Sequence, residues 1–338
     1  MNDPADAGSR PGPARDGASS AHRTPADPAD RAALADRADR AALADRAAFA
    51  AEWREWHAEH ERERTAPHGF LAVTDLQFVG EAPRRFDGIP GTWSLSPAGE
   101  PIVELDPALD ADGPLELPDG TMIASRYEFA PIPERGGVVL TRGRVQGGAA
   151  DRAGHGTGSI APAADRRSLE VARRGGRIVL RPRDPRAPLR TNHTGTPTYA
   201  PDPRWRIPGR YRAFDAPRPT TVGSALAGLE HVYDAPGEVE FEIDGRPLRL
   251  TVFGAGRDLL ALFTDATSGV TTYAANRSLL IPAPDADGRV ALDFNRAVNL
   301  PCAYTDHATC PLPPRENRLP VAIEAGERIP VERFAGAD

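Results

Sequence analysis

Short apolar runs, each closed by Pro, Gly or Asp, recur along the chain from His68 onward. Runs of this kind are typical of β-strands. Strands so closely spaced, with no long helical pattern between them, indicate an antiparallel sandwich or barrel. We therefore predict a mainly β fold: an antiparallel β-sandwich or barrel-like domain with an N-terminal α-helix packed on it. The predicted strands are Phe70–Val79, Pro101–Leu105, Thr121–Phe129, Gly137–Gln146, Ser168–Ala172, Arg177–Arg183, Gly209–Asp215, Glu238–Ile243, Pro247–Phe253, Leu259–Phe263, Arg289–Phe294 and Leu319–Glu324.

The clearest hairpin pattern surrounds Asp244 and Gly245. Apolar and polar residues alternate in the runs 238–243 and 247–253 on either side of this dipeptide. Asp-Gly supplies the positive φ angles that a tight two-residue turn requires. The two runs are therefore predicted to pair as a hairpin.

A helical pattern precedes the strands. Phe49, Trp53, Trp56 and His60 follow the i, i+4, i+7, i+11 spacing of one buried stripe. We expect a helix from Ala47 to about Arg64 to dock on the β domain, with the tryptophans packed in its contact. His57 and His60 are predicted to lie at the surface or at the rim of that contact.

The tail before this helix contains a duplication, DRAALADRA at 30–38 and again at 39–47. Ala and Arg favour helix, but a nine-residue step places Leu34 and Leu43 on opposite sides of it. A coiled-coil seam is therefore excluded, and a solvated helix is expected. Residues 1–29 carry almost nothing to bury and are predicted to be disordered. The expected division is a tail of residues 1–47 and a single mainly β domain of residues 48–338.

Composition narrows the range of functions. All 41 basic residues are Arg, so no lysine of this chain can form a Schiff base. The formal net charge is −7, with no basic stripe, so no nucleic-acid partner is expected. The start lacks a signal-peptide core and no run of 18 apolar residues occurs. We expect a soluble, cytoplasmic protein with no membrane partner; its oligomeric state stays open.

Several familiar active-site motifs are missing. The sequence has no G-x-S-x-G, H-E-x-x-H, Walker or paired C-x-x-C motif. Glycines within 144–160 resemble a flexible hairpin tip more than a phosphate loop. No cofactor is predicted.

Two long irregular segments remain. Asp184–Pro208 contains prolines that forbid regular strand pairing. It is read either as an interdomain linker or as a packed loop, such as a lid. The second segment, Val290–Glu327, is dense in Asn, Arg, Cys, Glu and Pro, and it holds most of the candidate chemistry.

Cys302, His307 and Cys310 fall within nine residues of the second segment. We interpret the cysteines first as buried thiols of a rigid loop, second as a disulfide, and third as part of a metal site with His307. The spacing is wider than zinc sites normally show, and no second ligand pair is apparent.

Polar residues follow the prolines of this segment. Glu316, Asn317 and Arg318 lie after Pro313 and Pro314, which restrict the backbone. Arg318 and Asn317 could hold a ligand carboxylate or phosphate. The same three residues could instead tie the loop to the sheet, and both interpretations are kept.

The approach to this loop offers further candidates. On a strand, Asp293 and Asn295 share a face opposite Phe294. If Glu324 faces Asp293, two carboxylates could share a site with separated pKa values. Asp293 and Glu324 are therefore the candidate catalytic residues. The proposed ligand-binding residues are Arg277, Asn295, Asn299, Tyr304, Glu316, Asn317 and Arg318.

The run LDFNRAVNLPCAYTDHATCPLPPRENRLPVAIEAGE resembles the C-terminal signature of a bacterial family known as domain of unknown function 1684. LFTDATSGVTTYAANRSL, before it, resembles that family's Asp-x-Thr-x-Gly, Tyr and Arg segment, although Asn276 stands where the family often has Gly. The resemblance implies a family domain from about Ala48 onward. It implies no catalytic assignment, because the family's function is itself unassigned.

Two functions are consistent with these patterns. The first is a small-molecule-binding protein or hydrolase-like enzyme, with a pocket for a polar or anionic ligand near the C-terminal signature loop. In a hydrolase, Asp293 or Glu324 would supply acid–base help. The alternative is a non-catalytic interaction or sensory module in which that loop is structural.

Overall fold

The computed structural model describes residues 28–110, 113–142 and 166–333. The glycine-rich run predicted to be a hairpin tip lies outside this part of the chain, as do residues 1–27 of the stretch 1–29 that was predicted to be disordered. Pro28 and Ala29, the last two residues of that stretch, begin a helix. The structure divides into two compact units, residues 1–45 and residues from Arg46 onward. Within the described residues, no helix is long and apolar enough to cross a membrane.

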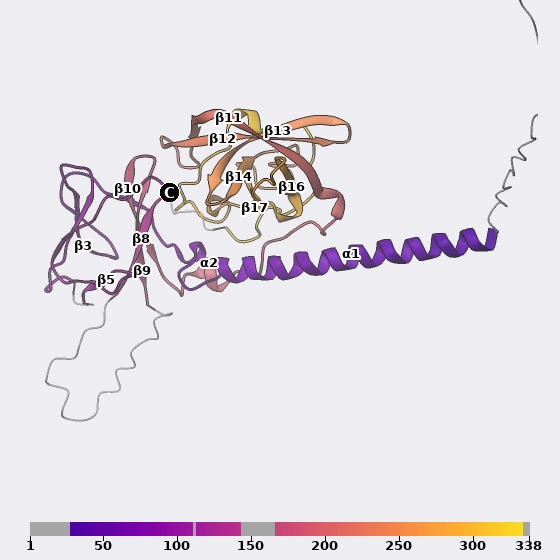
Figure 1. Ribbon diagram of the computed structural model, residues 1–338. Coiled ribbons are helices and arrows are strands. Elements are labelled where there is room, and N and C mark those ends of the chain that lie inside the picture. Colours follow the sequence, from indigo (N-terminus) through magenta and orange to yellow (C-terminus); the bar gives the residue numbers. More distant parts are fainter. Residues whose placement is uncertain (1–27, 111–112, 143–165, 334–338) are drawn as a thin grey trace, which may run out of the picture. The chain divides into compact units, whose positions relative to one another are not determined.

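Helix α1 runs from Pro28 to Arg64 (Figure 1). Its second half carries the predicted stripe: Trp53 is 7% exposed, and its indole Nε1 donates to the carbonyl of Asn295 at 2.7 Å. Leu43, in the duplicated segment, is 69% exposed. The predictions of a docked stripe and of a solvated helix before it are therefore confirmed at these positions.

Three antiparallel sheets follow the helix. The first has the order β1-β10-β9-β8-β5-β6, and the smallest has the order β2-β3-β4-β7. Together they enclose one apolar core, centred on residues such as Trp93, Val103 and Leu140. Their strands are β1 (Gln77–Phe78), β2 (Arg84–Phe86), β3 (Ile89–Leu95), β4 (Pro101–Glu104), β5 (Leu115–Glu116), β6 (Met122–Ile123), β7 (Arg126–Glu128), β8 (Gly137–Arg142), β9 (Ser168–Arg174) and β10 (Arg177–Arg183).

The largest sheet has the order β16-β11-β12-β13-β14-β15-β17 and its own core, which includes Val239, Leu250 and Phe263. Figure 1 shows β11 to β13 as its long central strands. Its strands are β11 (Arg206–Gly223), β12 (Glu230–Ile243), β13 (Arg246–Ala255), β14 (Asp258–Phe263), β15 (Arg277–Ile281), β16 (Arg289–Asp293) and β17 (Val298–Asn299).

The predicted hairpin joins β12 to β13. Ile243 pairs with Arg246, and Asp244 and Gly245 have φ angles of 52° and 74°. These are the left-handed values that the Asp-Gly dipeptide tolerates. The mainly β prediction is confirmed, with open sheets rather than a closed barrel among the described residues.

One predicted strand is confirmed only in part and another is wrong. In the first, Phe70–Ala72 forms the short 3-10 helix η1, Val73 makes an isolated bridge to Arg183, and Gln77–Phe78 pairs with β10 as β1. Leu319–Glu324 forms no strand. Pro320 lacks a donor, and the carbonyl of Ile323 accepts from the side chain of Arg277 instead of a neighbouring strand.

The irregular segment 184–208 packs on the rest of the protein as a loop. It contains helix α2 (Pro188–Thr191) and the 3-10 helix η3 (Pro203–Trp205), and Trp205 is buried. Its last three residues, 206–208, pair with β16, so the prediction that prolines exclude strand pairing is wrong there. Asp202 caps η3 by accepting from the backbone N–H of Arg204. Three further 3-10 helices shape the C-terminal segment: η4 (Phe294–Arg296), η5 (Pro301–Ala303) and η6 (Arg315–Asn317).

Candidate functional site

Asn317 sits at the end of η6 and is completely buried. Its side-chain oxygen accepts from the backbone N–H of Thr251 at 2.8 Å. Its amide nitrogen donates to the carbonyls of Thr251 and Leu262, each at 2.8 Å. The side chain therefore ties the C-terminal loop to β13 and β14, in agreement with the structural interpretation of this residue.

Arg277 begins β15 and is 1% exposed. Its Nη2 donates to Asp265 Oδ2 at 2.5 Å and to the carbonyl of Ile323 at 3.1 Å, and its Nη1 donates to the carbonyl of Ala325. Burial lowers the pKa of this guanidinium, and Asp265 opposes the shift. The anion that Arg277 holds is thus supplied by the protein itself.

Asp293 and Asn295 do not share a strand face, which corrects the prediction. Strand β16 ends at Asp293, whose carboxylate caps η4 by accepting from the backbone N–H of Asn295 at 3.2 Å. The Asn295 side chain bonds the backbone N–H and carbonyl of Asp202 at 2.9 and 3.0 Å. These residues fasten η3 to η4.

Glu324 and Arg318 are exposed. Glu324 lines a cavity of about 420 Å³ together with Trp205 and Glu242. Asp293 faces Arg296, with 3.5 Å between Oδ2 and Nε. Among the described residues no hydrogen bond links Asp293 to Glu324, so the structure offers no paired carboxylates at these positions.

A buried polar cluster surrounds Arg64 at the end of α1. The Arg64 guanidinium donates to Glu327 Oε1 at 2.5 Å, to Glu61 and to Thr196. Two of the predicted ligand-binding residues belong to this cluster. The backbone N–H of Asn299 donates to Glu327 Oε2 at 2.7 Å, and the Tyr304 hydroxyl lies 2.8 Å from Thr196 Oγ1.

Glycine is required immediately before Glu327. Gly326 has a φ of 74°, and a Cβ there would lie 2.4 Å from the carbonyl oxygen of Ala297. Only Gly combines this conformation with so close an approach. The Gly-Glu pair of the C-terminal signature thereby places the carboxylate against Arg64.

Burial dominates the electrostatics of this cluster. It raises the pKa of Glu327, although Arg64 opposes the shift. It lowers the pKa of His60 to about 4, and Arg64 adds to the effect. His57 and His60 do lie at the rim, but their rings stack on Trp53 and Trp56, with centroids 4.8 and 5.5 Å apart.

The cluster also includes one set of side chains with metal-like spacing. Among the described residues, ligand atoms of His57, Glu61 and Glu327 all lie within 4.8 Å of one another. Arg64 bonds both carboxylates, so a guanidinium already supplies the positive charge. Cys302, His307 and Cys310 do not form such a set.

A cavity of about 310 Å³ lies against the loop of the C-terminal signature, which contributes residues 300–301 and 309–311 to the lining. We call it the signature-loop cavity. Its lining includes the basic residues Arg135, Arg174 and Arg181. The rest of the lining is mostly apolar and comes chiefly from β12, β13, β14 and the loop. These residues include Tyr233, Phe253, Leu260, Leu262, Leu300, Pro301 and Cys310.

The strand register explains how two of these arginines, Arg174 and Arg181, come together. Arg181 pairs with Glu170 across β9 and β10, so their side chains share one face of the sheet. Buried Glu170 accepts from Arg181 Nη2 at 2.6 Å and from Arg174 Nη2 at 3.2 Å, and it also binds Arg183. One carboxylate therefore positions three guanidinium groups.

The residues that line this cavity include three arginines and no Asp or Glu. Burial and then the nearby Arg181 lower the pKa of Arg174. Arg135 stacks on Tyr233, with its guanidinium carbon 4.8 Å from the ring centroid. Within the described part of the chain, no carboxylate lies within ion-pair distance of Arg135.

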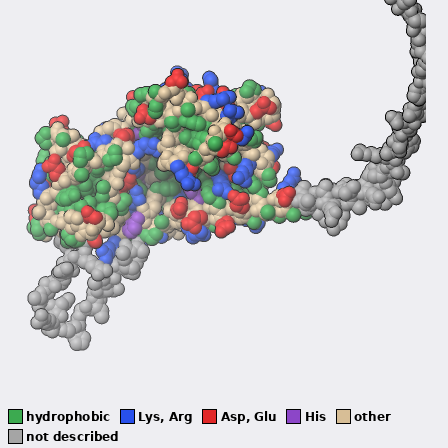
Figure 2. All heavy atoms as spheres, in the orientation of Figure 1, with side chains coloured by type: hydrophobic (Ala, Val, Ile, Leu, Met, Phe, Trp, Pro, Cys, Tyr) green, Lys and Arg blue, Asp and Glu red, His purple; other side chains and the backbone are tan. Residues whose placement is uncertain are grey.

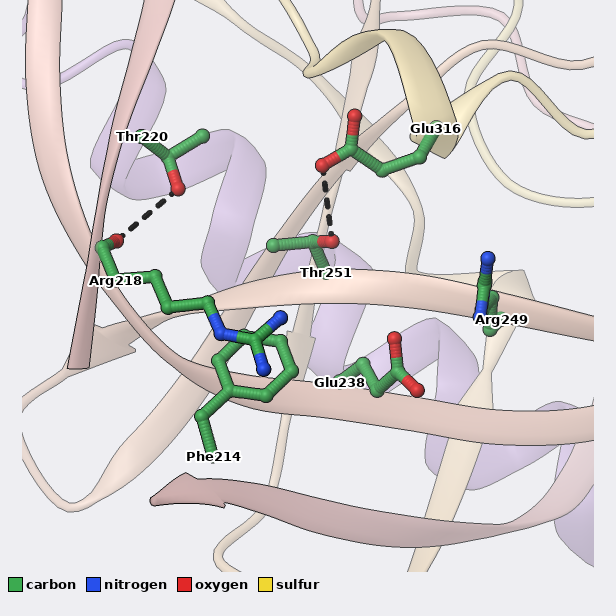
Figure 3. A pocket seen from close by; sticks show the side chains of 7 residues that line it. All are labelled: Phe214, Arg218, Thr220, Glu238, Arg249, Thr251 and Glu316. Atoms are coloured by element: carbon green, nitrogen blue, oxygen red, sulfur yellow. Dashed lines mark hydrogen bonds between the residues drawn. The ribbon is translucent and has the colours of Figure 1, made fainter. Parts of the chain in front are cut away.

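A third cavity, of about 260 Å³, lies beside η6 (Figure 3). Its lining includes Glu316, which accepts from Thr251 Oγ1 at 3.3 Å, and Arg218, which stacks on Phe214. Figure 3 shows basic and acidic side chains around the same space. Unlike the signature-loop cavity, it has no excess of one charge.

Sequence reasoning missed the three arginines of the signature-loop cavity. They lie more than a hundred residues before the loop: Arg135 in a turn before β8, Arg174 at the end of β9 and Arg181 on β10. The alternation of Ser168 and Glu170 with Leu169 and Val171 was the available signal. It marks a strand with one polar face, but not what that face meets.

The comparisons with known proteins indicate a family but no activity. No curated protein matches. A family model described as "Protein of unknown function (DUF1684)" matches residues 191–328. A solved structure of an uncharacterized protein from Haloarcula marismortui is 31% identical, with a TM-score of 0.35, over 41% of this chain and 78% of that one. The family model covers the segment that carries the signature, so residues 191–328 match the DUF1684 family, as the C-terminal motif predicted.

Proposed function

We propose that the protein binds a small molecule with an anionic head group and an apolar body in the signature-loop cavity. The head group would meet Arg135, Arg174 and Arg181, and the body would pack on residues such as Phe253 and Leu262. A guanidinium fork suits a carboxylate or a phosphate equally well.

The observation that carries this proposal is the uneven charge of the lining. Glu170 engages Arg174 and Arg181, whereas Arg135 has no carboxylate partner among the described residues. A bound anion would compensate the excess charge in a partly desolvated setting, where ion pairs are stronger than in water. The apolar wall would add the transfer free energy of a buried hydrocarbon.

The cavity volume limits the ligand. About 310 Å³ is at the lower end of the range for small-molecule sites, so a short acyl or aromatic acid fits better than a nucleotide cofactor. The role proposed for this cavity is ligand binding, with no catalytic step. Asp293 and Glu324, the acid–base candidates for hydrolysis, are not among the residues that line this cavity.

Isothermal titration calorimetry with octanoate tests the proposal, with octanol as the neutral analogue and acetate as the headgroup alone. We expect octanoate to bind and both analogues to bind at least about tenfold more weakly, because each lacks one of the two interactions. Equal binding of octanol and octanoate would exclude an anion site.

Arg135→Ala is the matching variant, because Arg135 holds no ion pair whose loss would unfold the protein. It should weaken octanoate binding about tenfold, which corresponds to about 1.4 kcal/mol. Arg257→Ala is the control, since Arg257 is 93% exposed and is not among the lining residues. If the two variants bind alike, the arginines do not recognise the head group.

A further inference from the structure

The two cysteines of the chain lie side by side in the C-terminal loop. The backbone N–H of Cys302 points at Cys310 Sγ, with 3.3 Å between nitrogen and sulfur. Both residues are buried and both are free thiols. Seven residues separate them, so the loop folds back on itself to bring them together.

The surrounding backbone holds this arrangement. The carbonyl of Cys302 accepts from the Tyr273 hydroxyl at 2.8 Å and from Arg333 Nη1 at 2.6 Å. The carbonyl of Cys310 accepts from the N–H of Ala225 at 2.8 Å. Both ends of the loop are thus fixed independently of the sulfur atoms, which favours bond formation between them over reaction with a partner.

The pair also has a route to small reagents. Cys310 belongs to the lining of the signature-loop cavity, and Cys302, which is 3% exposed, directly follows the lining residue Pro301. Contact with the Cys310 thiol lowers the pKa of Cys302, and the same contact raises the pKa of Cys310. The contact thus favours the thiolate of Cys302, and the thiolate is the reactive form.

We propose that Cys302 and Cys310 are an oxidisable dithiol, converted by a small peroxide into an intramolecular disulfide within the wall of the cavity. The Cys302 thiolate attacks one oxygen of hydrogen peroxide. The O–O bond breaks, a sulfenic acid forms on Cys302, and the leaving hydroxide takes a proton to become water.

The Cys310 sulfur then attacks the Cys302 sulfur. The S–O bond breaks, the S–S bond forms, and the departing hydroxide takes the Cys310 proton as a second water. In total, two thiols are oxidised by two electrons, and one peroxide is reduced to two waters. A thiol reductant reverses the step by exchange.

Intact mass spectrometry of the full chain tests this assignment. The reduced protein is treated with stoichiometric hydrogen peroxide and then with N-ethylmaleimide. We expect the mass to fall by two hydrogens, with no maleimide added, and dithiothreitol to restore two labelled thiols. The chain has only these two cysteines, so the mass identifies the link without ambiguity.

Two results would overturn the proposal. One is retention of both labels after peroxide treatment. The other is a gain of oxygen atoms on a single cysteine without loss of the second thiol. Cys310→Ser removes the resolving thiol and should stop the reaction at a sulfenic acid that dimedone traps; Cys302→Ser should react much more slowly, because the thiol with the lowered pKa is gone.

A second measurement links the dithiol to the cavity and rests on the proposed function. Saturating octanoate should slow disulfide formation severalfold, because it would occupy the space beside Cys310. If the disulfide forms equally fast with octanoate present, octanoate does not occupy the cavity and the ligand proposal fails, while the dithiol assignment stands.

Discussion

At the scale of single residues, buried polar side chains of the C-terminal segment form their hydrogen bonds mainly with backbone groups. Asn317 satisfies one donor and two acceptors that lie in the interior of β13 and β14. A buried backbone group without a partner costs about 1–3 kcal/mol. The loop is therefore coupled to the sheet through one amide.

Asn317→Ala should lower the free energy of unfolding by about 3 kcal/mol or more, because it leaves several buried groups unpaired. Urea denaturation followed by tryptophan fluorescence measures the change. Arg318→Ala, one residue away but exposed, serves as control and should stay within about 0.5 kcal/mol of the parent. Similar losses in both variants would show that the amide is not the anchor.

His60 makes the stability of the protein depend on pH. Its pKa is lowered to about 4 in the folded state, first by burial and then by Arg64, against about 6.5 when unfolded. The unfolded state therefore binds the proton first as the pH falls. This contribution to stability is complete above about pH 6.5 and is lost as the pH falls toward 4.

With allowance for solvent at the rim, the loss should be on the order of 2 kcal/mol between pH 7 and pH 4.5. Urea titrations across this range measure it, and His60→Gln should flatten the curve relative to the parent. Glu327, whose pKa is raised, acts in the opposite direction, so the difference between the two proteins isolates His60. Parallel curves would contradict the assignment.

At the scale of elements, α1 is attached through its second half. The buried indole of Trp53 donates to a carbonyl of η4, and Arg64 at the end of the helix binds Glu327. The helix is thus held by the buried indole of Trp53 and by ion pairs that include Arg64–Glu327 and Glu52–Arg296.

Trp53→Ala should cost about 3–5 kcal/mol, because it opens a cavity and leaves the Asn295 carbonyl without its partner. Thermal unfolding followed by circular dichroism measures the loss. The matched control is Leu43→Ala, on the exposed part of the same helix, which should leave the melting temperature unchanged. A small effect of Trp53→Ala would mean that the stripe does not hold the helix.

At the scale of the whole molecule, the part from Arg46 onward contains both apolar cores and both candidate cavities. Charge is spread over its surface: Figure 2 shows acidic and basic side chains interspersed on the visible face. Any ligand selectivity must therefore come from local groups such as Arg135.

A chain that begins at Arg46 should keep the fold and its ligand binding. The core residues and the cavity lining all lie after this point, so the melting temperature should change by no more than a few degrees. Differential scanning calorimetry of the shortened and full chains compares them directly. Loss of cooperative unfolding would show that residues before Arg46 contribute to the cores.

Local patterns determined much of this protein. The period-two alternation around Asp244 and Gly245, the helical stripe of Trp53, and the motif that identifies the family all depend on residues close in sequence. Patterns failed at 70–72, which form a 3-10 helix, and at 319–324, where an apolar run resembles a strand but the carbonyl of Ile323 accepts from the Arg277 side chain.

The tertiary structure alone decided which polar groups meet. The sequence marks Arg277, Asn317 and Tyr304 as unusual, but it does not show that their hydrogen bonds go to Ile323, Thr251 and Thr196. It gives no sign that Arg135 and Arg174 face a loop near residue 310. Hydrophobic periodicity fixes the face on which a side chain lies, whereas the packing of one sheet against another fixes what that face contacts.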